Sequence, residues 1–165
     1  MPIRTETFDL AAEYDDLCEQ IDDLESQREE YAENTPHFEQ ATAMRDELVR
    51  RRQGLERFAE LYPECGEIVL GELSPGEYAT LDSHLSGEYS QQEYRNVMTG
   101  VASVEAPYVV EGDGEATLQA VWEDVPPYFT RWATDAADDL LRPDGVEDNP
   151  FSQPSPTQTT ADQEE

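Results

Sequence analysis

Histidine and cysteine are the first side chains of this sequence to consider for catalysis or metal binding. The two histidines, His37 and His84, have no cysteine or second histidine at the spacing of a metal site. The two cysteines, Cys18 and Cys65, lack the short paired spacing of a zinc or redox motif. For both histidines an ordinary structural role is therefore the favoured interpretation.

Pairs of acidic residues are the other candidates for chemistry. Glycoside hydrolysis and calcium binding both need carboxylates that converge, whereas adjacent residues of a helix point apart. The pairs are Asp15–Asp16, Asp22–Asp23 and Asp138–Asp139. The stretch from Gly71 to Gly76 lacks the lysine and the spacing of a phosphate-binding loop. The sequence therefore predicts a protein that is not an enzyme, with no cofactor and no metal site.

A cluster of arginines is the remaining polar feature. They could grip phosphate or an acidic partner, or they could balance the acids of the segment from Phe8 to Tyr31. Acidic residues are interleaved with the arginines, which favours the second, structural interpretation. The arginines are Arg45, Arg50, Arg51, Arg52 and Arg57, and the interleaved acids are Glu47, Glu56 and Glu60.

The charge of the chain bears on its partners. Its 165 residues include 39 acidic and 10 basic side chains, for a net charge of −29, and every basic residue is arginine. This composition is typical of proteins from salt-saturated cytoplasms, where screening lets carboxylates crowd together. The acids are spread over almost every segment, so an acidic inhibitor that mimics nucleic acid is the less favoured alternative. Such a surface would repel nucleic acid and anionic membranes.

Membrane and export signals are not evident. The first six residues contain no apolar core of a signal peptide, and no apolar run approaches the ~20 residues that a membrane helix needs. We therefore expect a soluble, intracellular protein that has no membrane partner.

The N-terminal part has an apolar period of seven residues, from Phe8 to Tyr31 and again from Ala41 to Tyr62. Between these runs Thr35 is a candidate helix cap and Pro36 a candidate first-turn residue. We predict an antiparallel coiled-coil hairpin over residues 1–62. Its predicted seam consists of Leu10, Tyr14, Leu17, Ile21, Leu24, Tyr31, Met44, Leu48, Leu55 and Phe58.

The register of this hairpin follows from folding the chain about its turn. Ile21 then lies near Leu48, and Tyr14 lies near Leu55. Cys18 lies near Arg51, far along the rod from Cys65, so no disulfide is expected within the chain.

The segment after the hairpin predicts a small, mostly helical domain over residues 63–145. A short strand around Val69 leads into a helix with a capping box formed by Ser74 and Glu77. Ser90 and Glu93 form a second capping box. Two later helices carry Trp122 and Trp132, which are favoured as core residues over a ligand platform.

The complete prediction is therefore a mainly α-helical chain. It consists of the coiled-coil hairpin, the small helical domain with one or two short strands, and a tail. Residues 146–165 are rich in Pro, Ser, Gln and Thr and predict a disordered acidic and polar C-terminal tail.

Residues from Glu67 to about Arg142 resemble the tail assembly chaperones of long-tailed viruses. The resemblance is carried by IVLGELSPGEYATL, by YRNVMTGVASV followed by Ala106–Pro107, and by WEDVPPYFTRWATDAADDLL. It implies a small helical fold and a non-enzymatic protein that coats the tape-measure protein and helps to recruit tail-tube subunits. It also implies absence from the finished particle. Combined with the acidic composition, it indicates a protein of a tailed virus or provirus of a halophilic archaeon, acting in the host cytoplasm.

A chaperone of this kind must offer apolar surface, because apolar contacts survive molar salt. The candidates for partner binding are Tyr78, Leu81, Tyr128 and Phe129, with an amphipathic partner helix in a groove between them. A coiled-coil adaptor or structural virion component is the alternative, in which the hairpin supplies oligomerisation into a homo-oligomer.

Overall fold

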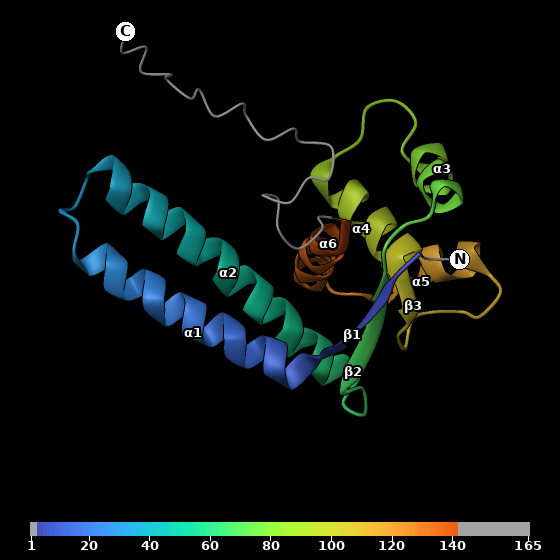
Figure 1. Cartoon of the computed structure of the whole chain (residues 1–165), viewed down its shortest axis with the longest axis horizontal. Coiled ribbons are helices and arrows are strands. Elements are labelled where there is room, and N and C mark those ends of the chain that lie inside the picture. The colour runs from blue at the N-terminus through green and yellow to red at the C-terminus, as the bar shows by residue number, and fades with distance from the viewer. Residues whose placement is uncertain (1–2, 142–165) are drawn as a thin grey trace, which may run out of the picture.

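A long helical hairpin projects from the rest of the molecule (Figure 1). The computed structural model describes residues 3–141, so the predicted tail over residues 146–165 lies outside the described residues. The hairpin consists of α1 (Leu10–Glu29) and α2 (Pro36–Leu61). As predicted, Thr35 caps α2 by accepting a hydrogen bond from the Phe38 amide, and Pro36 begins the helix.

A three-stranded antiparallel sheet lies at the base of the hairpin. Its strands are β1 (Thr5–Asp9), β2 (Glu67–Gly71) and β3 (Ser103–Glu105), in the order β1-β2-β3. The prediction of one or two strands was therefore too low. β1 has a single buried side chain, Phe8, so its sequence carries little of the alternation that marks a strand.

The hairpin is inserted between two neighbouring strands of this sheet. β1 pairs with β2 from Thr5–Gly71 to Asp9–Glu67. The Leu10 amide, at the start of α1, donates a hydrogen bond of 3.0 Å to the Gly66 carbonyl, just before β2. Both ends of the hairpin are thus fixed to the same edge of the fold.

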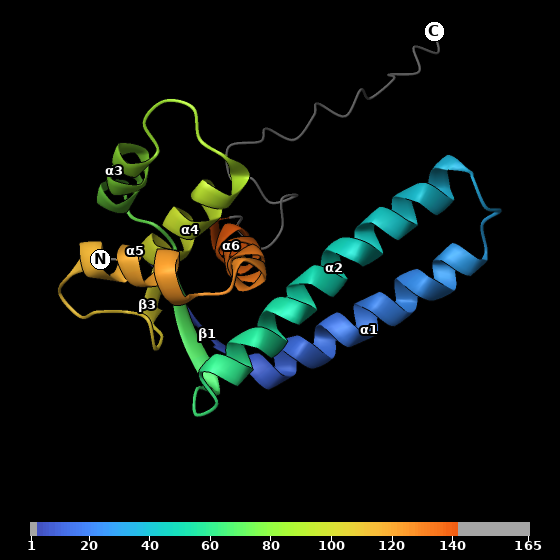
Figure 2. The ribbon, with the colours of Figure 1, turned by 180° about the vertical axis from the view of Figure 1, so that it is seen from behind.

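Four shorter helices complete the described structure. They are α3 (Pro75–His84), α4 (Gln91–Ala102), α5 (Gly114–Asp124) and α6 (Pro127–Leu141). Both predicted capping boxes are confirmed, at Ser74 and at Ser90. Figure 2 shows the same molecule from behind, with α6 as the helix that packs on the hairpin and α3 on the far side of α4.

The hydrophobic core lies where the base of the hairpin meets α6. Phe58 of α2 packs on Phe129 of α6, and Phe8 of β1 forms a T-shaped contact with Trp132. Residues from both sides of the predicted boundary between residues 62 and 63 therefore share one core. Trp132 is a core residue as expected, whereas Trp122 is 56% exposed, which corrects the prediction for that side chain.

The predicted seam residues differ in burial along the hairpin. Leu17, Ile21, Leu55 and Phe58 are buried, and Leu10, Tyr14, Leu24 and Leu48 are partly buried. Tyr31 and Met44 are exposed, so the expectation that they are covered is wrong. The structure shows two antiparallel helices; the supercoil of a true coiled coil remains a prediction.

The register of the hairpin is close to the predicted one. The Tyr14 hydroxyl donates a hydrogen bond of 2.8 Å to Glu56, the neighbour of the predicted partner Leu55. Cys18 lies 4.0 Å from Arg52, one residue from the predicted Arg51. Both cysteines are free.

Candidate protein-binding site

The four residues predicted to bind a partner do not form one surface. Tyr78 and Tyr128 are 42% and 41% exposed, but Leu81 and Phe129 are buried in the core, so the expectation that they remain available is wrong. Tyr78 belongs to α3 and Tyr128 to the start of α6, and α4 lies between these two helices in both views (Figures 1 and 2). A groove between the four side chains is therefore absent from the described part of the chain.

An apolar groove runs instead along the hairpin. It has a volume of about 590 Å³, and its apolar residues come from facing positions of α1 and α2. Met44 is 52% exposed at its edge, and Leu24 and Leu48 are partly buried within it. The residues of this hairpin groove are Gln20, Asp23, Leu24, Ala43, Met44, Glu47, Leu48 and Arg51.

The position of α6 explains why this groove stays open. Near the base of the hairpin, α6 covers the apolar face of α2, and Phe58 there has no exposed surface. Farther from the base, the same seven-residue pattern continues to Leu48 and Met44, but no described helix covers it (Figure 1). The sequence identified these side chains as a seam, yet it could not show where α6 would stop.

A second groove lies beside β3, between α3 and the segment that leads into α5. Its volume is about 1080 Å³, and Val104, Val109 and Val110 contribute apolar surface. Its lining also includes the acidic residues Glu77, Glu105, Glu111, Asp113 and Glu115. This β3 groove is larger in volume than the hairpin groove and has more acidic residues, so it fits an apolar helix face less well.

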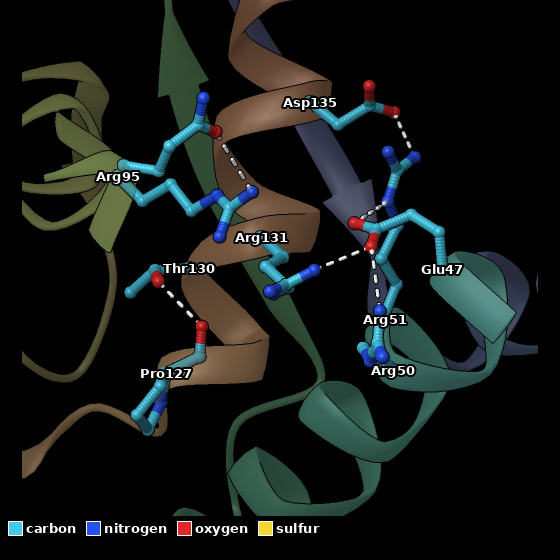
Figure 3. A network of polar contacts seen from close by, with 9 residues as sticks. Glu47, Arg50, Arg51, Arg95, Pro127, Thr130, Arg131 and Asp135 are labelled. Atoms are coloured by element: carbon cyan, nitrogen blue, oxygen red, sulfur yellow. Dashed lines mark hydrogen bonds and ion pairs between the residues drawn. The ribbon is translucent and has the colours of Figure 1, made fainter. Parts of the chain in front are cut away.

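A cluster of charged side chains borders the hairpin groove where α2 crosses α6 (Figure 3). Glu47 of α2 accepts a hydrogen bond of 2.5 Å from Arg131 of α6, and it lies 3.5 Å from the Nε of Arg51. Arg51 in turn donates a hydrogen bond of 2.8 Å to Asp135 of α6. Two residues of this cluster, Glu47 and Arg51, also line the groove.

These contacts correct the predicted role of the arginines. Among the described residues, the ion pair that joins α1 to α2 is Arg45–Glu25, at 3.0 Å. The ion pairs of Arg51 in the described structure are with Glu47 of α2 and with Asp135 of α6, which lies 84 residues later in the chain. The arginine cluster therefore attaches the hairpin to α6 as much as it balances α1.

Arg95 of α4 belongs to the same cluster and was not singled out by the sequence. It is partly buried, and its guanidinium donates a hydrogen bond of 3.4 Å to Gln91. Burial lowers the pKa of Arg95, and the positive charge of Arg131 lowers it further. No spacing or motif in the sequence signals that α4 and α6 would bring Arg95 and Arg131 together.

Neither histidine joins a reactive group in the described structure. His37 stacks on Tyr31 with ring centroids 5.3 Å apart, and His84 lies near the end of α3. Within residues 3–141, no group of three or more His, Cys, Asp or Glu side chains could hold a metal ion. None of the described helices combines the length and apolar character needed to cross a membrane.

No protein family, no curated protein and no solved structure matches this chain. The function must therefore be argued from the surfaces of the protein itself.

Proposed function

We propose that this chain is a non-enzymatic tail assembly chaperone of a tailed virus of a halophilic archaeon. In this proposal it acts in the host cytoplasm and holds an amphipathic helix of the tape-measure protein in the hairpin groove. The resemblance of residues 67–142 to such chaperones supports the viral assignment. The observation that carries the mode of binding is the uncovered apolar groove between α1 and α2.

The groove has the form that a helix requires. Leu24 of α1 and Leu48 of α2 line the groove, and Met44 offers a flexible, exposed side chain at its edge. A partner helix in this position would add a third helix to the pair, with its apolar residues spaced by three or four. Complete burial of a Met or Leu side chain contributes about 1.5–3 kcal/mol, and this contribution does not depend on attraction between charges.

Salt supports the choice of the hairpin groove over a charged surface. At molar salt the Debye length is about 3 Å, so exposed carboxylates attract a partner only weakly. Apolar burial persists under these conditions. A protein with a net charge of −29 thus needs an apolar surface to bind its partner at high salt.

The test is co-expression with the tape-measure protein of the same genome at high salt. We expect the wild-type chain to keep that protein soluble and to co-purify with it. Met44→Asp should abolish both effects, because it places a charge in the groove without disturbing a buried residue. Val110→Asp is the matched control, since Val110 is 44% exposed in the β3 groove.

Three results would contradict parts of the proposal. If Val110→Asp or Tyr78→Asp abolishes binding and Met44→Asp does not, the partner binds beside α3 rather than at the hairpin. Self-association that Met44→Asp removes would make a second copy the occupant of the groove. A chain that does not bind the tape-measure protein but is stoichiometric in mature particles would be a structural virion component instead.

A further inference from the structure

The charged cluster at the α2–α6 crossing contains more arginines than acids, although the chain has a net charge of −29. Its four guanidinium groups belong to Arg50, Arg51, Arg95 and Arg131 (Figure 3). The carboxylates that pair with these arginines are Glu47 and Asp135. Four positive charges against two negative charges leave an excess of two.

Arg95 accounts for much of this excess. Among the described residues it forms no ion pair, and its side-chain hydrogen bond is to the neutral amide of Gln91. Of the charges that act on it, Arg131 lowers the pKa of Arg95 most, and the opposite effect of Glu47 is smaller. A partly buried cation in this position lowers the stability of the folded chain, because it is desolvated without being paired.

Arg131 has one hydrogen-bond donor without an acceptor. One of its terminal nitrogens binds Glu47, but its buried Nε has no hydrogen-bond partner in the structure. Its guanidinium lies 5.6 Å from the centre of the Tyr128 ring, and Tyr128 is 41% exposed. Arg131 thus keeps one donor that Glu47 does not satisfy, and the other described contact of its guanidinium is the ring of Tyr128.

We propose that Arg95 and Arg131 form a binding site for a carboxylate of a partner protein. An Asp or Glu side chain between them would accept hydrogen bonds from both guanidinium groups and neutralise the unpaired charge. The site adjoins the hairpin groove, because Glu47 belongs to both. A partner that lies in the groove could place one acidic residue at this end.

A carboxylate fits the site better than a nucleic-acid phosphate does. Nucleic acids present phosphates in continuous runs, and the acidic surface around the cluster repels such runs. A single carboxylate is small enough to contact the two arginines without approaching the surrounding acidic residues. The assignment concerns the chemistry of the ligand and does not depend on the identity of the partner as a tape-measure protein.

The experiment measures binding of capped triglutamate to the full-length chain by NMR, with the Nε–Hε signals of arginine as the readout. Potassium chloride keeps the ionic strength constant, and capped triglutamine is the control peptide. We expect triglutamate to shift the signals of Arg95 and Arg131, and triglutamine to leave them unchanged. Arg95→Gln should weaken binding about tenfold, as expected for loss of a charge-assisted hydrogen bond.

Arg57→Gln is the matched variant, because it removes the same charge from an exposed arginine that pairs with Glu60. It should bind triglutamate like the wild type. Without peptide, the melting temperature of Arg95→Gln should be equal to or above that of the wild type, since an unpaired cation is removed. Equal binding by Arg95→Gln and the wild type would overturn the site, as would unfolding of Arg95→Gln. Binding of inorganic phosphate but not of triglutamate would overturn the carboxylate assignment.

Discussion

Phe58 of α2 and Phe129 of α6 stack face to face, with ring centroids 4.0 Å apart and an interplanar angle of 12°. Both rings are completely buried, although 71 positions separate them in the sequence. This contact joins the base of the hairpin to the last helix. It also explains why Phe129, which the sequence suggested as a partner contact, belongs to the core.

Replacing Phe129 by Ala should lower the free energy of unfolding by about 3–5 kcal/mol, because it leaves a cavity against Phe58. Tyr128→Ala is the control, since its exposed ring contributes a cation–π contact with Arg131 worth about 0.5–1 kcal/mol. Urea denaturation followed by tryptophan fluorescence measures both. Equal losses for the two variants would show that the Phe58–Phe129 contact does not hold α6 in place.

Gly54→Ala should destabilise the protein, although Ala favours a helix over Gly by about 1 kcal/mol. A Cβ atom at Gly54 would overlap the backbone of Tyr128 and the amide nitrogen of Phe129, so α6 would have to move away. We expect a loss of about 1–3 kcal/mol, typical of overpacking. The measurement is the melting temperature at a fixed salt concentration.

Gly76→Ala provides the comparison for Gly54. A Cβ atom there would meet only the Ser74 hydroxyl oxygen, at 4.0 Å, so the helix preference of Ala should dominate. An unchanged or higher melting temperature is expected. If Gly54→Ala behaves in the same way, α2 and α6 are not in contact at this position.

The stability of the protein should fall at alkaline pH because of Tyr108. Burial raises the pKa of Tyr108 above its usual value, and the hydrogen bond with Ser103 offsets this only in part. An unfolded tyrosine ionises near pH 10, so above about pH 10 the unfolded chain loses a proton that the folded chain keeps. The contribution of Tyr108 to the free energy of unfolding is therefore constant below this pH and decreases as pH rises above it.

Tyr108→Phe should make that decrease less steep. Part of the decrease should remain in this variant, because burial also raises the pKa values of Tyr62 and Tyr94. At neutral pH the variant should lose about 1 kcal/mol, since Ser103 still donates to the Thr99 carbonyl. Urea titrations at several pH values measure both effects, and an identical pH profile for the variant would show that Tyr108 ionises as freely as an exposed tyrosine.

Salt should stabilise the fold. The net charge of −29 produces repulsion within the folded chain that dilute buffer does not screen. Between millimolar and molar potassium chloride, we expect the helical circular dichroism signal and the melting temperature to rise. A melting temperature that is independent of salt would argue against adaptation to a halophilic cytoplasm.

Local features of the fold were predictable from the sequence. The caps at Thr35, Ser74 and Ser90 depend on residues three positions apart, and all three form as expected. The seven-residue period correctly predicted the two long helices and a register close to the observed one. In each case, the information lies within a short stretch or in a regular repeat.

Features that depend on distant contacts were not predictable. β1 becomes a strand through its pairing with β2, about 60 residues later in the chain. The amphipathic pattern around Val121 did not show that Trp122 faces solvent. The proposed carboxylate site needs Arg95 of α4 beside Arg131 of α6, a proximity that only the packing of the two helices creates. The hairpin groove was predictable in part, since the sequence identified its apolar residues as a helix seam but did not show that this part of the seam is exposed.

The insertion of the hairpin between β1 and β2 has a consequence for the order of folding. Without the hairpin, pairing of Asp9 with Glu67 would close a loop that contains the whole segment from Leu10 to Gly66. When α1 and α2 pair along their length, this loop becomes short, because the two ends of the hairpin are then neighbours. Local helix pairing would thus remove most of the entropy cost of closing the sheet, so we expect the two helices to dock before the strands pair.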